Sequence, residues 1–361
     1  MNSEMPGKLA SVGAGVVVFV VLVASYIIAR TPEDVLGGAL VDQPEDATSG
    51  ARVEYTLKDG STAGAVGSDL ARLGVIRSAS QFELLVSLMG VQDKLSAGDY
   101  TLTRNSPVLR VVGELSVRES VAVLRVTFPE GIRFEEMAVI AEKAGFGTQA
   151  EFLAAVAAAQ LPPDLARSLP AGKSLQGYLF PDTYILPAGA PMAALVALMI
   201  ETFDQRFTPE LRARAEAEGL NTHQAVTLAA IVEREAVIES ERPLIARVFY
   251  NRIEEGDRLG ADPTTQFVAA LDPASVQKHG WWKKGLTIDD LESQNPYNTR
   301  QVVGLPPGPI TNPGLASLQA VANPDDSDLY YFVADATKND GSHAFARTLA
   351  EHEANIARVG E

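Results

Sequence analysis

The sequence predicts an α+β protein built from an N-terminal transmembrane helix, a small α+β subdomain and a larger mixed α+β domain. An unbroken apolar run fills residues 9–29, and short alternating and helical stretches follow over residues 51–125. Longer helical stretches with aromatic turns fill residues 126–361. The chain has 361 residues, of which 46% are hydrophobic and 21% charged, so it is long enough for more than one core.

The apolar run LASVGAGVVVFVVLVASYIIA, residues 9–29, carries no charge. A helix of about 21 residues matches the ~30 Å hydrocarbon core of a bilayer. A cleaved signal peptide is the alternative, but its apolar region is usually about 7–15 residues long, and no clear A-x-A site follows. We therefore predict an anchor in the cell (inner) membrane, with residues 1–8 cytoplasmic and the body extracytoplasmic. Lys8 and Arg30 balance each other, so this orientation depends on the long, acidic C-terminal side.

Residues 30–50 form an acidic linker without apolar periodicity. The subdomain after it has the order strand, helix, helix, strand, followed by another helix and strand. The expected elements are a strand in VEYTL, helices at 63–73 and 81–89, a strand at 99–102, a helix at 107–115 and a strand at 121–128.

The larger domain is predicted to be mostly helical, with a turn at PEGIRF and an aromatic strand or loop at LQGYLFPDTYILP. Residues 256–310 are expected to be rich in loops. The remaining expected elements are helices at 134–144, 149–160, 192–218, 222–236, 243–255, 314–321 and 346–358 and a strand at 329–334.

Composition excludes several classes of function. Thirty basic and 46 acidic residues give a net charge of −16, which argues against a nucleic-acid partner. The absence of cysteine excludes disulfides, thiolate metal sites and cysteine nucleophiles. Motifs for serine hydrolases, phosphate loops and dinucleotide binding are absent, and the four histidines lack metal-ligand spacing. We expect neither a cofactor nor a metal.

The remaining chemistry lies in carboxylates, above all in AVTLAAIVEREAVIESER, residues 225–242. Glu233 and Glu235 end an almost wholly apolar helix and, two residues apart, lie on different faces. A glutamate that faced a cleft would be desolvated and protonated, as a general acid must be. The alternative is that both glutamates pair with nearby arginines, and periodicity does not decide between these interpretations.

Several long motifs resemble one enzyme family. They are IVEREAVIESERPLIARVFYNRIEEGDRLGADPTTQF, PYNTRQVVGLPPGPITNPGLASLQAVANP, LYYFVA, GSHAFARTLAEH, VTFPEGIRFEEMA and LQGYLFPDTY. Together they resemble the endolytic murein transglycosylases, the MltG or YceG-like family. The small subdomain resembles the LysM-like unit of that family.

The resemblance implies a peptidoglycan lytic transglycosylase, a lyase that cuts the β-1,4 bond between N-acetylmuramic acid and N-acetylglucosamine and leaves a 1,6-anhydro end. It implies that Glu235 is the catalytic acid and that the enzyme terminates nascent strands beside peptidoglycan synthases. The expected substrate-binding residues are Asn251, Arg252, Asp262, Gln266, Tyr297, Asn298 and Thr299.

Some of these residues have ordinary structural alternatives. Asn251 and Arg252 also suit a helix-end contact, and an aspartate before proline is a common turn former. Tyr178 and Phe180 suit sugar stacking, although such aromatics more often lie in a core.

Three departures from the family pattern stand out. Gln176 replaces a usual glutamate, Ala236 replaces a threonine or serine, and Gly260 and Ala261 replace the usual residues before Asp262. They leave the catalytic glutamate intact and bear on rate and substrate preference. The rival hypotheses are a non-catalytic peptidoglycan-binding or scaffold protein and a hydrolase of the same bond.

Overall fold

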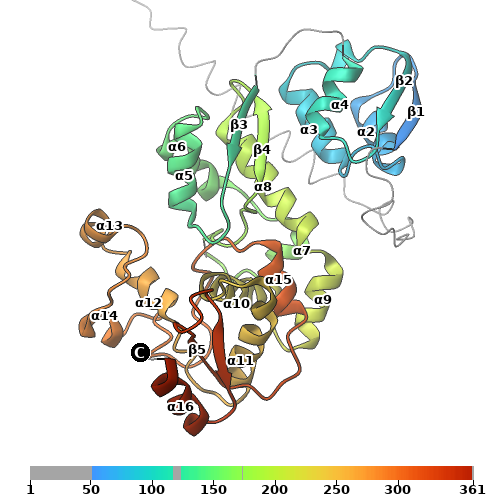
Figure 1. The fold of residues 1–361 in the computed structure, drawn as a ribbon. Coiled ribbons are helices and arrows are strands. Elements are labelled where there is room, and N and C mark those ends of the chain that lie inside the picture. Colours follow the sequence, from blue (N-terminus) through green and yellow to red (C-terminus); the bar gives the residue numbers. More distant parts are fainter. Residues whose placement is uncertain (1–50, 117–122, 173, 360–361) are drawn as a thin grey trace, which may run out of the picture. The chain divides into compact units, whose positions relative to one another are not determined.

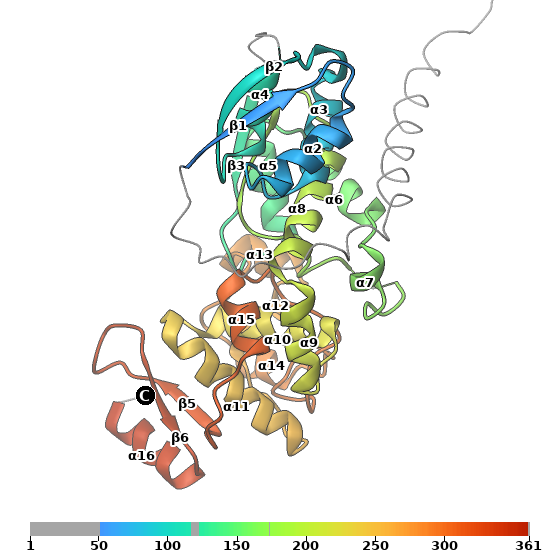
Figure 2. The same ribbon diagram turned by 90° about the vertical axis from the view of Figure 1, so that its right-hand side faces the viewer.

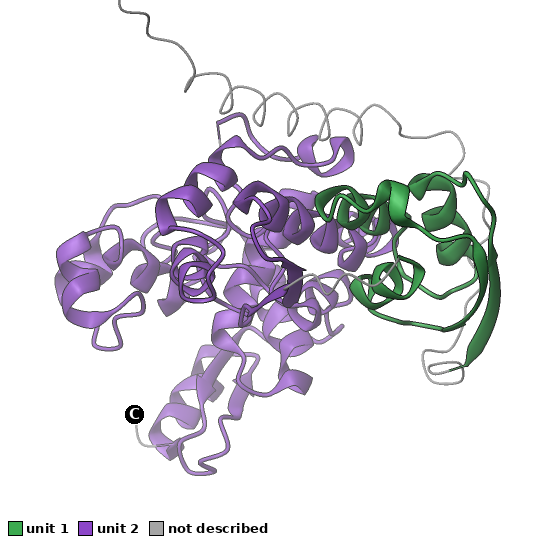
Figure 3. Cartoon of the chain, turned by 90° about the horizontal axis from the view of Figure 1, so that it is seen from above, with its two compact units in different colours: residues 1–121 green, residues 122–361 purple. Residues whose placement is uncertain are grey.

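The computed structural model describes residues 51–116, 123–172 and 174–359. They form two compact units that divide between residues 121 and 122 (Figure 3). Helices predominate, and the described residues contain three two-stranded antiparallel sheets. This composition confirms the predicted α+β class.

Unit 1 has the predicted order of strand, helix, helix and strand, followed by one more helix (Figure 1). Thr62 and Ser78 begin the two longer helices, and each side chain accepts a hydrogen bond from the N–H three residues on. The elements are β1 (Arg52–Leu57), α2 (Ala63–Arg72), α3 (Ala79–Leu88), a 3₁₀ turn (Gln92–Lys94), β2 (Gly98–Thr103) and α4 (Val108–Leu115).

The core of unit 1 is its own. β1 and β2 pair antiparallel from Arg52 opposite Thr103 to Leu57 opposite Gly98. The apolar side chains of both strands and all three α-helices form one buried cluster, in which Phe82 is fully buried. Unit 1 therefore has the hydrophobic core that an independent domain needs.

Unit 2 contains an antiparallel pair of strands that are distant in sequence, a helical centre and a small C-terminal sheet (Figures 1 and 2). Its strands are β3 (Val123–Thr127), β4 (Thr183–Pro187), β5 (Tyr331–Ala334) and β6 (His343–Ala346). Its helices are α5 (Phe134–Lys143), α6 (Gln149–Ala158), α7 (Pro163–Ala166), α8 (Met192–Arg206), α9 (Pro209–Ala217), α10 (Thr222–Glu235), the 3₁₀ turn η3 (Glu239–Glu241), α11 (Arg242–Glu254), α12 (Asp262–Ala269), α13 (Pro273–His279), α14 (Ile288–Glu292), α15 (Leu315–Ala322) and α16 (Leu349–Val359).

The helix α10 lies at the centre of unit 2, where it packs against α9, α11, α12 and α15. The turn after β3 is joined to the GLPPGPITNP segment by hydrogen bonds from Gly131 N to Asn312 O and from Asn312 N to Ile132 O. Together with the bond from Gly314 N to Glu233 Oε2, these bonds bring PEGIRF, the end of α10 and the start of α15 to one place.

The structure corrects one prediction and refines another. The expected helix 192–218 is two helices, because Thr208 caps α9 and Pro209 occupies its first turn. Residues 256–310 are mainly loop, as predicted, but they also contain the short helices α12, α13 and α14. The starts of these helices were visible as D-P, D-P and T-x-x-D, but each helix is too short to show a periodicity.

The C-terminal region differs in one respect from its prediction. The strand β5 falls within the predicted strand, but β6 pairs with it and delays the last helix until Leu349. A four-residue strand such as β6 gives too few positions for an alternating pattern to be recognised.

No helix within the described residues is both long and apolar enough to cross a bilayer. The predicted membrane helix, residues 9–29, and the acidic linker, residues 30–50, lie outside the described residues.

Candidate active site

Helix α10 carries the two candidate glutamates in its last turn. Asn221 caps the helix by accepting a hydrogen bond from Gln224 N, and the Gln224 side chain accepts one in return from Asn221 N, both at 3.0 Å. Every side chain from residue 225 to residue 232 is buried. The helix is therefore fixed by its neighbours, and only its last turn reaches polar surroundings.

Glu233 is fully engaged within the protein. Arg242 Nη2 donates to its Oε1 at 3.2 Å, and the Gly314 backbone N–H donates to its Oε2 at 3.0 Å. Arg242 Nε also donates to Ser317 Oγ, and the Glu233 side chain is only 6% exposed. Glu233 thus fits the ion-pair interpretation and joins α10 to α11 and α15.

The exposed Glu130 of PEGIRF lies on the same side of the helix as Glu233. Its carboxyl packs so closely on Gly314 that a Cβ at that position would collide with it. Desolvation by the surrounding atoms raises the pKa of Glu130, and the charge of Glu233 raises it further. The sequence analysis did not single out Glu130, because its neighbours come from distant segments.

Glu235 has a different environment. It is half-buried, and neither carboxyl oxygen has a hydrogen bond or ion pair with a described residue or is sealed from solvent. Burial raises the pKa of Glu235 to about 8, and the negative charge of Asp262 contributes to the rise. The positive charges of Arg300, Arg252 and Arg234 oppose it. A carboxyl that is protonated at neutral pH and reachable from solvent can act as a general acid.

Arg252 and Asn251 lie together on α11 but contact different parts of the chain. Arg252 donates from Nε to Tyr330 O at 3.0 Å and from Nη1 to Leu259 O at 2.5 Å. Asn251 Nδ2 donates to the carbonyls of Ser327 and Leu329. Asn251 therefore ties α11 to the segment before β5.

Asn251 also borders a polar hollow of about 650 Å³ between α11 and the segments around residues 326–331 and 347–349. Glu235 is not among the residues that line this hollow. Arg252 is thus the member of the predicted pair that acts electrostatically on Glu235.

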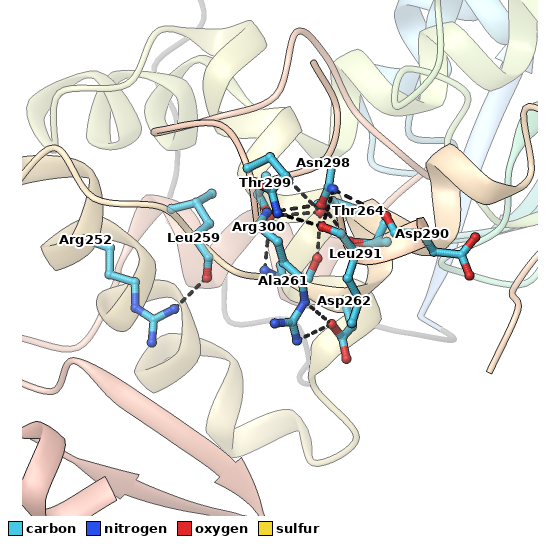
Figure 4. A network of polar contacts seen from close by, with 12 residues as sticks. Arg252, Leu259, Ala261, Asp262, Thr264, Asp290, Leu291, Asn298, Thr299 and Arg300 are labelled. Carbon is cyan, nitrogen blue, oxygen red and sulfur yellow. Dashed lines mark hydrogen bonds and ion pairs between the residues drawn. The ribbon is translucent and has the colours of Figure 1, made fainter. Parts of the chain in front are cut away.

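Asp262, in the first turn of α12, forms an ion pair with Arg300 (Figure 4). The Nη2 and Nε atoms of Arg300 reach the same Asp262 oxygen at 2.5 and 2.6 Å, and about half of the Asp262 side chain is exposed. Gln266, one turn further along α12, is half-buried, and its side chain has no hydrogen bond with a described residue. Both predicted residues can be reached by a ligand.

The departure at Gly260 is explained by its backbone. Its φ of +65° favours glycine, and its N–H donates to Thr299 O at 3.0 Å. An added Cβ would also lie only 3.6 Å from Arg252 Nη1. Gly260 therefore lets the chain before α12 turn beside Arg252.

Asn298 and Thr299 of the Y-N-T motif are fully buried and use their polar atoms inside the protein (Figure 4). Asn298 Oδ1 accepts from Thr265 Oγ1, and its Nδ2 donates to carbonyls of the 290–293 segment. Thr299 Oγ1 contacts Thr264 Oγ1 at 2.8 Å and accepts from Ala261 N. These two predicted contact residues hold the loop that presents Arg300.

Tyr297 remains partly exposed. Its ring packs on Phe267 with centroids 4.8 Å apart, and burial raises the pKa of its hydroxyl. Its hydroxyl lies close to Gly308, so only part of the side chain is open to a ligand.

The aromatic motif LQGYLFPDTY belongs to the core. Tyr178 and Phe180 are buried, and the Tyr178 hydroxyl contacts His223 Nδ1 at 3.0 Å. Gln176 is also buried and accepts a hydrogen bond from the Phe134 N–H at the start of α5. These three residues support the site from within.

The sequence analysis missed a cluster of cations and aromatic rings near the end of α10. Arg133 lies between the rings of Phe267 and Trp281, at 4.3 and 4.7 Å, while Arg234 lies 4.0 Å from the ring of Trp282. The only signal for it was the tryptophan pair in the otherwise polar segment HGWWKKG.

Within the three described ranges, no three histidine, aspartate or glutamate side chains converge as metal ligands. The absence of a metal or cofactor stays a prediction.

Comparison with known proteins agrees with this architecture. The chain is 28% identical over 337 residues to the endolytic murein transglycosylase of Bacillus subtilis (strain 168). The alignment covers 88% of this chain and 89% of that protein. The protein of the same name from Streptococcus pneumoniae D39 is also 28% identical, but this chain spans only 59% of its length.

A crystal structure of a putative yceG-like protein from Listeria monocytogenes superposes with a TM-score of 0.54 at 27% identity. It covers 84% of this chain and 98% of that one. The model of the YceG-like family matches residues 55–358, which reach from β1 to the last helix. The chain therefore belongs to the YceG-like family.

Proposed function

We propose that this protein is an endolytic murein transglycosylase, a lyase that cuts peptidoglycan strands at the β-1,4 bond between N-acetylmuramic acid and N-acetylglucosamine. The observation that carries the proposal is Glu235, a half-buried carboxyl without a hydrogen-bond partner among the described residues, whose pKa is raised by burial to about 8. The names of the relatives at 27–28% identity support the same reaction.

The chemistry requires one group that first gives and then takes a proton. Protonated Glu235 donates to the glycosidic oxygen as that bond breaks, and positive charge develops at the muramyl C1. The resulting carboxylate then takes the proton from the 6-hydroxyl of the same sugar, whose oxygen closes onto C1. The products are a 1,6-anhydromuramyl end and a strand with a free 4-hydroxyl, and Glu235 is protonated again.

The anhydro reaction and hydrolysis differ in the number of carboxyl groups that they require. A hydrolase of this kind needs a second carboxylate to act on water or on C1. The acid that acts electrostatically on Glu235 is Asp262, and the Arg300 ion pair occupies one of its oxygens. A single proton-transferring carboxyl is what the anhydro reaction uses.

The exposure of the predicted site residues indicates which of them contact the glycan. Arg252, Asp262, Gln266 and Tyr297 are accessible and are proposed to contact the sugar. Asn251, Asn298 and Thr299 are proposed to act indirectly, since their side chains hold the surrounding segments.

We further propose that residues 9–29 anchor the protein in the cell membrane with both units outside the cytoplasm, and that unit 1 is a LysM-like peptidoglycan-binding unit. The uncharged apolar run supports the anchor, and the strand–helix–helix–strand order supports the LysM-like assignment. Strand termination beside peptidoglycan synthases would follow from this location.

The deciding experiment is mass spectrometry of purified glycan strands after incubation with the full chain in detergent. Glu235→Gln is the test variant, and Glu255→Gln, at an exposed position of the same unit, is the matched control. Circular dichroism first verifies that all three proteins fold alike. We expect anhydro-ended fragments from the wild type and the control only.

The other outcomes separate the rival functions. Fragments with reducing ends would show a hydrolase, and anhydro fragments from Glu235→Gln would move the acid elsewhere. Intact strands from the wild type, together with retention on peptidoglycan sacculi, would favour a binding or scaffold protein.

A further inference from the structure

Two arginines beside Glu235 carry charges that no ion pair with a described carboxylate neutralises. Arg234 Nη1 donates to Gly131 O at 3.5 Å, and its guanidinium lies over the Trp282 ring. Arg252 donates to the carbonyls of Tyr330 and Leu259. All of these partners are neutral, and the remaining cation near Glu235, Arg300, is paired with Asp262.

The acids within electrostatic range of these two arginines are already engaged. For Arg234 these acids are Glu136 and Glu233. Glu136 accepts hydrogen bonds from Trp282 Nε1 and Arg133 N. Glu233 accepts hydrogen bonds from Arg242 Nη2 and Gly314 N. For Arg252 it is Asp257, which accepts from the Tyr330 hydroxyl and from Arg258 N. These carboxylates are therefore oriented by other donors, and none of them forms an ion pair with Arg234 or Arg252.

The outer amino group of each guanidinium is available. The Nη2 atoms of Arg234 and Arg252 have no hydrogen-bond partner among the described residues, and neither is sealed from solvent. Arg252 Nε and Nη1 and Arg234 Nη1 donate to backbone carbonyls, and Arg234 also lies over the Trp282 ring, so both side chains are already restrained before a ligand binds. Burial lowers the pKa of both arginines because it removes water from the cation. A bound anion would offset this cost of desolvation.

We propose that Arg234 and Arg252 form a carboxylate-binding subsite, which makes binding and cleavage depend on a negative charge on the muramyl residue. The ligand class follows from the proposed function. A muramyl residue carries a lactyl group that either ends in a carboxylate or continues into a peptide stem with its own carboxylates. Guanidinium groups are well suited to binding either carboxylate.

The test uses small ligands that contain no bond to cleave. Binding of N-acetylmuramic acid and of N-acetylmuramyl-alanyl-glutamate to the full chain is measured by calorimetry, and each ligand is compared with its fully amidated form. We expect the carboxylate forms to bind about 10-fold or more tightly than the amides. If N-acetylmuramic acid binds more tightly than its amide, the subsite recognises the lactyl carboxylate. If only N-acetylmuramyl-alanyl-glutamate binds more tightly than its amide, the subsite recognises a carboxylate of the peptide stem.

Variants then assign the residues. Arg234→Gln and Arg252→Gln should each reduce the carboxylate-to-amide ratio toward 1, whereas Arg167→Gln, at an exposed arginine of the same unit, should retain the wild-type ratio. Equal wild-type affinity for both forms overturns the subsite without requiring any variant to fold. Discrimination that survives in both arginine variants overturns the assignment to these residues.

Cleavage assays separate this inference from the proposed function. If the wild type cleaves native and amidated strands with equal kcat/KM and binds both probe forms equally, the subsite fails and the transglycosylase stands. If it cleaves neither strand but discriminates between the probes, the subsite stands and the reaction fails.

Discussion

The two sides of the last turn of α10 present the same functional group in opposite states. On one side, Arg242 and Gly314 occupy both oxygens of Glu233. On the other, Glu235 is half-buried and has no hydrogen-bond partner among the described residues, so burial raises its pKa to about 8. The difference teaches that desolvation produces a usable acid only where the protein withholds a compensating partner.

The largest expected effect is on catalysis by Glu235→Gln. We expect turnover of glycan strands to fall about 10²- to 10⁴-fold, the usual contribution of a general acid. The variant should match the stability of the wild type near pH 4 and exceed it at pH 7, because the unfolded glutamate is ionised at pH 7 while the folded one stays protonated, and glutamine has no such cost. Product formation by mass spectrometry and thermal unfolding measure the two quantities. A stable variant with wild-type turnover would remove Glu235 from the mechanism.

Glu233→Gln should give the reverse pattern. It leaves Arg242 with a neutral partner in a buried setting, and breaking such a pair costs about 3–5 kcal/mol of the free energy of unfolding. Urea unfolding measures this loss. At temperatures where the variant stays folded, it should retain far more turnover than Glu235→Gln, and equal losses would contradict the division of roles.

The pH dependence should distinguish the two carboxyls as well. Because Glu235 must be protonated, kcat/KM should fall above about pH 8, by about tenfold per pH unit. The pKa of Glu235 is raised from 4.5 on folding, so its contribution to stability is complete below pH 4.5 and is lost as pH rises toward 8. Thermal unfolding from pH 4 to pH 9 should therefore show wild type losing stability relative to Glu235→Gln. A constant difference between them would place the pKa of Glu235 near its ordinary value.

The smallest expected effect concerns the exposed Asp262–Arg300 pair. Arg300→Gln removes a cation that lowers the pKa of Glu235 and leaves Asp262 unpaired, so the alkaline limit of activity should move up. Asp262→Asn should move it down. Each shift should stay within about one pH unit, because exposed charges are well screened. Shifts in the same direction would show that the pair does not act on Glu235 through its charge.

Much of the fold could be predicted from sequence periodicity. The order of elements in unit 1, the helices α5, α6, α10 and α11 and the strand β3 all carry local patterns of adequate length. The helices α12 to α14 and the strand β6 were missed because four to eight residues contain too little repetition. The break at Thr208–Pro209 was missed although proline and a capping threonine signalled it.

The candidate site was predictable in its residues but not in their roles. The motif around residues 233–235 pointed to the end of α10, and the Y-N-T motif pointed to residues 297–299. The sequence did not show that Asn298 and Thr299 are fully buried or that Arg234, Arg300 and the two tryptophans surround the acid. These facts depend on side chains brought together from distant segments.

The sequence by itself determined the α+β class, the buried helix that carries both glutamates and the membership in the YceG-like family. Each of these depends on local periodicity or on long contiguous motifs. Tertiary structure decided which glutamate is left free. Periodicity places Glu233 and Glu235 on different faces of one helix, but only folding brings Gly314, 81 residues away, to Glu233 and leaves Glu235 half-buried without such a partner among the described residues. The pKa of a carboxyl is set by the water and donors around it, and those come from the whole chain.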